Sequence, residues 1–242
     1  AYFATDRLTA QNGVSAFDNP QGKGTTDIYS FELSAADRPQ PVTYVQAIIF
    51  DAVSKKTLVA NVEFMELGAG KTYASAVTET DGEFLITLPA GGNYALNVSK
   101  EKYLFYSENF ALNEPGTMDK PFKLNIALQP VGVGSDGSAA KPIVLKNVFF
   151  ETGSAALRKE SLVELARLKK LLDENPSLKI QINGHTDNVG SEGDNIKLSN
   201  DRAKAVYDYL TQNGINEVRL KYKGFGESVP AASNETEAGK RL

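Results

Sequence analysis

The stretch that most constrains what this chain can fold into covers residues 183–202 and reads NGHTDNVGSEGDNIKLSNDR. It follows an alternation of apolar and polar residues over 178–182, which predicts a strand that ends in a glycine-rich turn. Further on, apolar residues recur at helical spacing from Ala203, and Ser199 is placed to cap a helix over 200–213 that Gly214 ends. The sequence therefore predicts a strand, a loop and a helix that meet at one end.

Two opposite charges are expected to share this meeting point. Asp187 stands at the exit of the strand, and Arg202 stands in the expected first turn of the helix. A carboxylate and a guanidinium at a fixed separation can bind the ammonium and the carboxylate of a zwitterion. The N–H groups at the start of the helix would add to the attraction for an anion. From the residues alone, a structural salt bridge between Asp187 and Arg202 is the competing interpretation.

Composition narrows the classes of function. The 242 residues contain no cysteine and one histidine, His185, so a metal site or a Ser-His-Asp triad would lack partners. We expect His185 to hold the turn by a ring hydrogen bond, with no metal and no cofactor. Residues 141–242 carry 16 Lys+Arg against 14 Asp+Glu, an excess too small for a nucleic-acid surface. No run of about 18 apolar residues is present, so no membrane-spanning helix is predicted.

The chain before this region divides into three parts by pattern. Residues 1–40 read as two strands around a long loop, and two strands alone form no core. The chain starts directly on a strand, which suggests a piece of a longer precursor. Residues 41–130 predict an all-β sandwich with Asp81-Gly82 as a tight hairpin turn. Its expected strands are 44–50, 62–66, 73–78, 84–88, 94–99 and 123–128. Residues 131–141 are rich in Gly and Ser and predict a flexible linker.

The last part, residues 142–242, alternates strand and helix patterns. The expected elements are a strand over 143–150, a helix over 158–175, a strand over 179–183, the helix over 200–213 and a strand over 219–223. The first helix is expected to bury one apolar face formed by Leu162, Leu165, Ala166, Leu168, Leu171 and Leu172. This order predicts an α/β domain with a mixed sheet. The flexible linker would let this domain reorient against the sandwich.

Several motifs of the last part carry a family resemblance. VFFETGSAAL, HTDN, LSxxRA, GxGE and NxTxxG occur in this order, and across 143–242 they resemble the OmpA-like peptidoglycan-binding domain. The resemblance implies non-catalytic binding of peptidoglycan through the diaminopimelate of its stem peptide. Asp187 would take the ammonium of this ligand and Arg202 its carboxylate. Asn195 and Phe150 would complete the ligand contacts.

The remaining matched positions are expected to support this site. His185 and Thr186 would form the turn, and Leu198 and Ser199 would form the start of the helix. Two features depart from the family. Glu151 stands where the family has Asp, and the chain ends at Arg241-Leu242 where the family continues with a final strand. The domain is therefore expected to lack that strand or to have it disordered, which would expose a sheet edge.

The earlier parts also resemble known modules. VQAIIFDAVSKKTLVANVEF together with TETDGEFLITLPAGGNYALNVSKEKY resembles the carboxypeptidase-regulatory-like β-sandwich of transthyretin type, which implies a non-catalytic spacer or binding surface. YFATDR and the later DIY resemble the last blade of a WD40-like β-propeller; an N-terminal hairpin packed on the next domain is the alternative.

The order of the three modules resembles the PorE-like cell-wall anchors of the type IX secretion and gliding apparatus. This implies a periplasmic, outer-membrane-associated location, with outer-membrane secretion or gliding proteins as partners. The first alternative is an assembly adaptor whose sandwich and propeller bind a membrane protein. The second is an enzyme that acts on the wall, but the sequence offers no paired acid and base, no zinc set and no activated nucleophile.

Overall fold

The computed structural model describes residues 2–5, 27–30, 33–34, 40–67, 70–112, 116–132 and 142–229. The chain divides into two compact units, Ala1–Pro41 and Val42–Leu242. In the first unit, β1 (Tyr2–Thr5) pairs antiparallel with β2 (Asp27–Ser30). Both strands expected near the N-terminus are thus present, and their assignment to a propeller blade stays a prediction.

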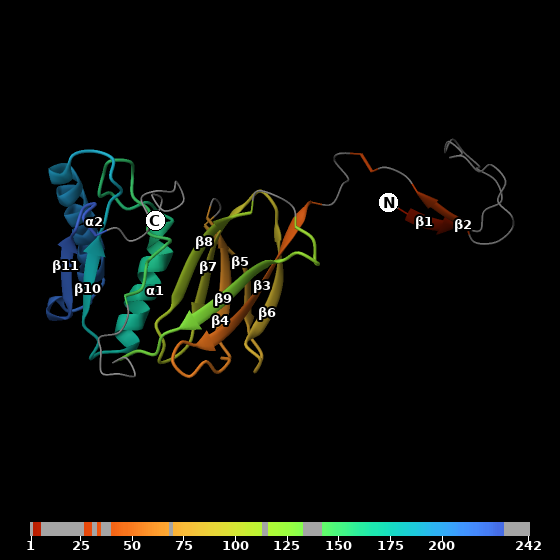
Figure 1. Ribbon diagram of the computed structural model, residues 1–242, viewed down its shortest axis with the longest axis horizontal. Helices are drawn as coiled ribbons and strands as arrows, with labels where there is room; N and C mark the ends of the chain where they lie inside the picture. The colour runs from red at the N-terminus through yellow and green to blue at the C-terminus, as the bar shows by residue number, and fades with distance from the viewer. Residues whose placement is uncertain are drawn as a thin grey trace. The chain divides into compact units, whose positions relative to one another are not determined.

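The second unit begins with two sheets that share one apolar core (Figure 1). The strand order is β6-β3-β9 in one sheet and β5-β4-β7-β8 in the other. The strands are β3 (Val42–Asp51), β4 (Asn61–Glu66), β5 (Lys71–Val77), β6 (Glu83–Pro89), β7 (Asn93–Ser99), β8 (Tyr106–Ala111) and β9 (Phe122–Leu128). All six expected strands are present, and β8 is an addition that the sequence pattern did not predict.

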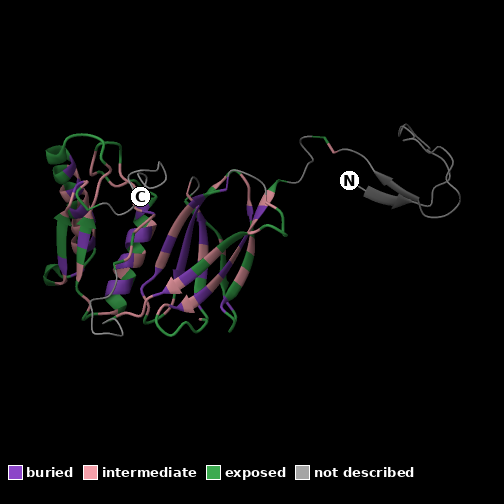
Figure 2. Ribbon diagram, viewed as in Figure 1, coloured by how far each residue is buried: buried purple, intermediate pink, exposed green. Residues whose placement is uncertain are grey.

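Burial along the strands follows from this arrangement (Figure 2). In β3 every second residue is buried, as expected for a strand with one face toward the core. In β7 the five residues from Tyr94 to Val98 are all buried. Tyr94, Leu96 and Val98 face the sandwich core, so Ala95 and Asn97 must be covered from the other side of the sheet.

The Asp81-Gly82 turn differs from its expected role. It joins β5 to β6, which lie in different sheets, so it does not close a hairpin. The turn chemistry is nevertheless present: Gly82 has φ 72°, and a Cβ there would lie 2.4 Å from the carbonyl oxygen of Ile49. The Ile49 N–H donates to the Gly82 carbonyl at 2.9 Å. Glycine is required because the turn presses its backbone against β3.

The C-terminal part contains α1 (Ser161–Glu174), β10 (Ile180–Gly184), α2 (Glu192–Gln212), the 3-10 turn η1 (Glu217–Arg219) and β11 (Leu220–Gly224). Strands β10 and β11 pair in parallel (Figure 1). The expected strand over 143–150 is wrong: only Phe150 forms a bridge, to Leu157. Its apolar residues pack instead, partly buried, against the helical core. Within the described residues, neither helix combines the length and apolar composition needed to cross a membrane.

Helix α1 buries four of the six apolar residues expected on its buried face, and its buried surface is wider than expected. Leu162 and Ala166 are exposed, whereas Ser161 and Glu164 are buried together with the core leucines. Leu165, Leu168, Leu171 and Leu172 belong to the core shared with α2. The helix also starts at Ser161 and not at 158. Two neighbours explain the wider buried surface, because α1 packs on its own domain and on the sandwich.

Helix α2 begins eight residues earlier than expected, at Glu192 instead of 200. Its N-cap is Ser191, whose Oγ accepts from the backbone N–H of Asp194 at 3.2 Å and donates to the carboxylate of Asp194 at 2.7 Å. Ser199 and Leu198 therefore lie inside the helix and do not cap it. Arg202 lies in the middle of α2, so the expected first-turn position for this residue is also wrong.

The sandwich contacts the C-terminal domain through the outer face of the four-stranded sheet. Glu63, Asn97 and Ser107 lie side by side in register on β4, β7 and β8. Arg167 of α1 forms an ion pair with Glu63. With the Asn97 amide oriented to satisfy both neighbours, its oxygen accepts from Arg167 Nη1 at 3.1 Å. This face explains why β7 is buried on both sides.

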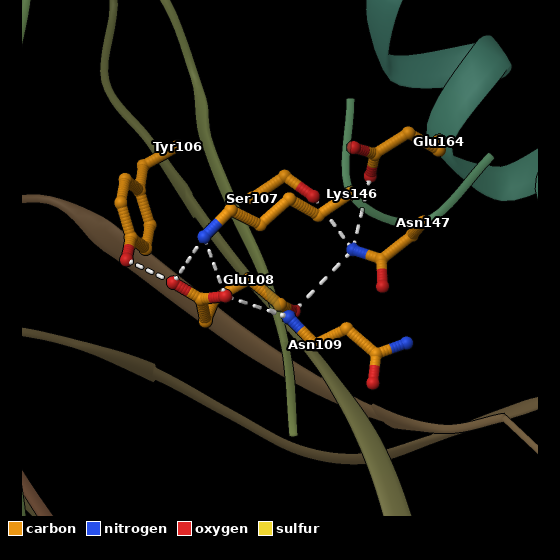
Figure 3. Close-up of polar contacts among 7 residues, drawn as sticks. All are labelled: Tyr106, Ser107, Glu108, Asn109, Lys146, Asn147 and Glu164. Carbon is orange, nitrogen blue, oxygen red and sulfur yellow. Dashed lines mark hydrogen bonds and ion pairs between the residues drawn. The ribbon is translucent and has the colours of Figure 1, made fainter. Parts of the chain in front are cut away.

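Glu164 of α1 also takes part in this contact, and Figure 3 shows its carboxylate next to the Asn147 amide. The residue is 1% exposed, and its Oε2 accepts from Asn147 Nδ2 at 3.5 Å and from the Asn97 amide at 3.0 Å. Within the described ranges, its Oε1 has no hydrogen-bond partner. Burial raises the pKa of Glu164, although hydrogen bonds from Ser107 and Asn147 and the charge of Arg167 act in the opposite sense. The carboxyl group is thus held in an unfavourable place for a charge.

A second polar contact extends the same surface. Lys146 Nζ donates to both carboxylate oxygens of Glu108, at 2.7 and 2.8 Å, and Tyr106 donates its hydroxyl to this carboxylate at 2.7 Å (Figure 3). Asn147 donates to Ser107 Oγ at 2.6 Å. We call the contact formed by Glu63, Asn97, Ser107 and Glu108 with Lys146, Asn147, Glu164 and Arg167 the seam. The seam joins two parts that the sequence predicted to reorient, and residues 133–141 of the expected linker lie outside the described residues.

Candidate functional site

Two glycines fix helix α2 onto the ends of β10 and β11. Gly184 and Gly224 are register partners at the last position of each strand. A Cβ on Gly184 would lie 2.0 Å from the Ser199 carbonyl oxygen, and one on Gly224 would lie 2.3 Å from the Asn200 nitrogen. Only glycine permits this close approach of helix and strands. The loop after β10 is thereby placed directly beside the helix.

Backbone contacts then hold the HTD loop to the segment after β11. Phe225 N–H donates to the Gly184 carbonyl at 2.9 Å, and Thr186 N–H donates to the Gly226 carbonyl at 3.0 Å. The His185 ring stacks on Phe225 with centroids 5.5 Å apart, and its Nδ1 donates to the Val229 carbonyl. His185 therefore makes a ring hydrogen bond at the turn. The Thr186 hydroxyl oxygen is buried and has no hydrogen-bond partner among the residues that the structure describes.

Asp187 presents its carboxylate from this loop. Oδ1 accepts from the Val189 N–H at 3.1 Å, which closes an Asx turn and orients the side chain. The Asp187 carbonyl accepts from Asn195 Nδ2 at 3.3 Å. Among the described residues no cation lies within ion-pair distance of Asp187, Arg202 included. The structural salt bridge considered from the sequence is therefore not formed.

Arg202 faces the same region from α2. Its Nε donates to the Ser154 carbonyl at 3.0 Å, and its guanidinium lies over the Phe150 ring, 5.0 Å from the centroid. Burial lowers the pKa of Arg202, while the charge of Asp187 acts in the opposite sense. The two Nη groups have no hydrogen-bond partner among the described residues. The Nε side of the guanidinium is thus fixed by the 150–154 loop, and the described residues leave the two Nη groups available for a ligand.

This arrangement can recognise a small zwitterion. The guanidinium is half-buried against an aromatic ring, where its charge is less screened than in open solvent, and its Nη groups can bond a carboxylate. The Asp187 carboxylate lies close enough for its charge to act on Arg202, yet the two groups do not neutralise each other by direct contact.

Asn195 is held differently from the expected ligand contact. It is 5% exposed, and its Nδ2 donates to Glu227 Oε2 at 2.7 Å and to the Asp187 carbonyl. Ser199 accepts from the Gly226 N–H at 2.9 Å and donates to the Ile196 carbonyl. Both side chains bind the protein's own loops.

Sequence reasoning missed two contributors to the site, the Ser154 carbonyl and Glu227. The GxGE motif contains Glu227 and was visible, but nothing local indicates its partner. Glu151, the departure from the family pattern, pairs at the surface with Arg158 at 3.4 Å. The described residues do not include Arg241 or the NxTxxG motif. The prediction that the final strand is lacking also concerns residues outside the described ones. A shallow hollow of about 260 Å³ between Lys179, Val218 and Lys221 touches none of the site residues.

Comparison with known proteins agrees with the motifs. The profile of the OmpA family matches residues 149–242. Outer membrane porin F of Pseudomonas fluorescens is 33% identical over 96 residues, which cover 40% of this chain and 29% of that protein. The peptidoglycan-binding protein ArfA of Mycobacterium bovis is 38% identical over 103 residues, which cover 43% of this chain and 32% of that protein. The chain thus spans about a third of the length of these relatives.

Solved structures align with a similar share of the chain. The peptidoglycan-associated lipoprotein of Burkholderia pseudomallei is 26% identical with a TM-score of 0.36, covering 39% of this chain and 80% of that one. The cell wall anchor of the T6SS from Pseudomonas aeruginosa is 28% identical with a TM-score of 0.35, covering 38% and 67%. The sequence match confirms the α/β domain predicted for this region, whose described strands β10 and β11 are parallel. The chain therefore carries an OmpA-family domain over residues 149–242.

Proposed function

We propose that the OmpA-family domain binds peptidoglycan non-covalently and without catalysis, and so anchors this chain to the cell wall. The observation that carries the proposal is the Asp187 and Arg202 arrangement: two opposite charges face one region, and within the described residues neither forms an ion pair. The name of the relative ArfA, a peptidoglycan-binding protein, supports the same ligand class.

The finer part of the proposal is that the ligand group is the diaminopimelate of the stem peptide. Its free end carries an ammonium and a carboxylate on one carbon. Asp187 would accept from the ammonium, and the Nη groups of Arg202 would donate to the carboxylate. Phe150 would form a wall that keeps water from the guanidinium. Lysine lacks this distal carboxylate, so a lysine-type stem peptide would leave Arg202 unpaired.

A place in the cell envelope follows from the same proposal. The names of the relatives include an outer membrane porin and, in Escherichia coli, a probable lipoprotein. The order of the modules supports a further step, in which the sandwich links the wall to an outer-membrane secretion or gliding assembly. This assembly, like the carboxypeptidase-regulatory-like origin of the sandwich, is a proposal from resemblance.

Isothermal titration of the full chain with a diaminopimelate-containing muropeptide tests the ligand. We expect Asp187→Ala and Arg202→Ala each to weaken binding at least tenfold, because each removes a charge-assisted hydrogen-bond partner. Lys204→Ala and Asp208→Ala are matched controls, since these residues form an exposed pair on the same helix with Nζ to Oδ2 at 2.6 Å. They should leave binding within twofold of the unaltered chain.

The ligand chemistry is tested separately with a lysine-type muropeptide. The unaltered chain should bind it at least tenfold more weakly, and Arg202→Ala should bind both muropeptides about equally. The proposal is wrong if the unaltered chain binds neither muropeptide. It is also wrong if the site variants bind like the two controls. Equal binding of the two muropeptides by the unaltered chain would contradict the diaminopimelate assignment alone.

A further inference from the structure

The segment directly after β11, residues 225–227, is hydrogen-bonded to the elements that form the candidate site. Gly226 N–H donates to Ser199 Oγ at 2.9 Å, and the Gly226 carbonyl accepts from the Thr186 N–H at 3.0 Å. Gly226 has φ 55°, and a Cβ there would lie 3.0 Å from Ile196. The segment thus contacts the HTD loop on one side and α2 on the other, and its next residue is Glu227.

The side chain of Glu227 adds a further hydrogen bond between this segment and α2. Its Oε2 accepts from Asn195 Nδ2 at 2.7 Å, and the same nitrogen donates to the Asp187 carbonyl at 3.3 Å. Asn195 is 5% exposed, so water cannot readily replace either partner. The amide nitrogen therefore bridges a half-buried carboxylate and the backbone of the residue that presents the proposed ammonium ligand.

We propose that Glu227 is a positioning residue that sets the place of the Asp187 carboxylate by orienting the Asn195 amide. The inference rests on the proposed function of the site. The Asn195 amide can rotate by half a turn, and its oxygen would then face the Asp187 carbonyl, where two acceptors repel. The carboxylate of Glu227 prevents this because it accepts only hydrogen bonds, so Nδ2 must point toward it. The Asp187 backbone is thereby fixed. Because Asp187 Oδ1 accepts from the Val189 N–H in an Asx turn, the side chain is oriented relative to this backbone.

This role predicts a selective effect on binding. Arg202 is held by Ser154 and Phe150. In the part of the chain that the structure describes, neither of these residues forms a hydrogen bond or a ring contact with Glu227. Loss of Glu227 should therefore weaken recognition of the ligand ammonium and leave recognition of the carboxylate intact. A general loss of structure would weaken both.

The test compares two ligands with the full chain by titration calorimetry: the diaminopimelate muropeptide, and the same muropeptide acetylated on the free amine. We expect Glu227→Ala to weaken binding of the first roughly tenfold, as for the loss of one charge-assisted hydrogen bond. Binding of the acetylated ligand should stay within twofold of the unaltered chain. Glu227→Gln, which keeps an acceptor, should recover most of the loss. Glu192→Ala removes an exposed carboxylate from the same end of α2 and should change neither.

A double-variant cycle tests the route through Asn195. If Glu227 acts through this amide, Asn195→Ala combined with Glu227→Ala should bind no more weakly than Asn195→Ala alone. Equal weakening of both ligands by Glu227→Ala would overturn the inference, as would an unchanged affinity for the first ligand while Asp187→Ala still abolishes binding. Failure of Asp187→Ala and Arg202→Ala to weaken binding would instead count against the proposed function.

Discussion

Replacing Glu164 by Gln should change how the stability of the C-terminal domain depends on pH. Burial raises the pKa of Glu164 above the usual 4.5, although Ser107, Asn147 and Arg167 act against this shift. The folded protein therefore keeps the proton to a higher pH than the unfolded chain does. Protonation of Glu164 contributes stability that is complete below pH 4.5 and is lost as the pH rises through the folded-state pKa.

The magnitude follows from the one oxygen without a partner. Oε2 is hydrogen-bonded, whereas Oε1 is buried and unsatisfied, and an unsatisfied buried polar group costs about 1 to 3 kcal/mol, more when it is charged. Gln keeps the shape and one acceptor but never carries the charge. At pH 8 we expect Glu164→Gln to raise the free energy of unfolding by about 1 to 2 kcal/mol. At pH 4 the protonated carboxyl resembles the amide, so the difference should fall below about 0.5 kcal/mol.

Urea unfolding followed by circular dichroism at 222 nm suits this test, because both described helices lie in the C-terminal domain. With a slope near 2 kcal/mol/M, the expected change at pH 8 moves the midpoint up by about 0.5 to 1 M. Glu160→Gln, at an exposed residue just before α1, is the matched control and should move the urea midpoint at pH 8 less than Glu164→Gln does.

The test compares the free energy of unfolding of the variant with that of the unaltered chain at each pH. Neither protein alone would suffice, because Glu63 is present in both and its contribution changes with pH in the opposite sense. Burial would raise the pKa of Glu63, but hydrogen bonds from Thr72 and Arg167 and the charge of Arg167 lower it overall. Its contribution is therefore present above pH 4.5 and lost as the pH falls. The same stability difference between Glu164→Gln and the unaltered chain at pH 4 and pH 8 would refute the reasoning and assign Glu164 a role in shape alone.

Two further substitutions test the scaffold. Gly184→Ala would place a Cβ 2.0 Å from the Ser199 carbonyl and should destabilise the C-terminal domain by about 3 kcal/mol or more; Gly193→Ala, in the same region with open space around it, should stabilise α2 by up to about 1 kcal/mol. Equal urea midpoints for both would contradict the close packing. Tyr103→Phe removes the hydroxyl that donates to Asp51 Oδ2 at 2.6 Å and should cost about 1 to 2 kcal/mol at pH 7. This hydrogen bond is the main cause of the lowered pKa of Asp51, so the cost should shrink as the pH falls below 3.8, and a pH-independent cost would argue against it.

The strands of the sandwich could be predicted wherever one face was apolar. Strand β8 could not, because its residues Ser107, Glu108 and Asn109 interrupt the apolar pattern. Two of these polar residues face the seam, where side chains of another domain complete their hydrogen bonds. A strand whose outer face is covered by a polar partner resembles a loop in the sequence, because the partner lies far along the chain.

The start of α2 was missed although a signal was present. Ser191 and Asp194 have the spacing of a capping box, but the surrounding glycines favoured a loop. Ser199 looked like the cap because serine often caps helices, whereas it is fully buried and binds the Gly226 N–H. The misplaced start put Arg202 in the wrong turn of the helix.

The charged pair of the candidate site was nevertheless identified from the sequence, because its motif is local. Its supports were less accessible. Glu227 lies 32 residues from Asn195, and no periodicity connects them. The Ser154 carbonyl is a backbone group, and backbone acceptors have no signature in a sequence. Local patterns thus indicated the groups that would meet a ligand, and the contacts that hold them required the fold.

The seam also bears on how the sandwich and the OmpA-family domain are oriented. Leu104 and Phe105 of the sandwich join the apolar core of the C-terminal domain, and apolar contacts alone tolerate small displacements. Arg167 does not, because one nitrogen pairs with Glu63 and another meets the Asn97 amide. A shift of one residue along the strands would separate this partly buried guanidinium from both partners and leave its charge unpaired. We therefore infer that these few polar contacts, and not the length of the segment between the two parts, set the direction in which the Asp187 and Arg202 site faces relative to the sandwich.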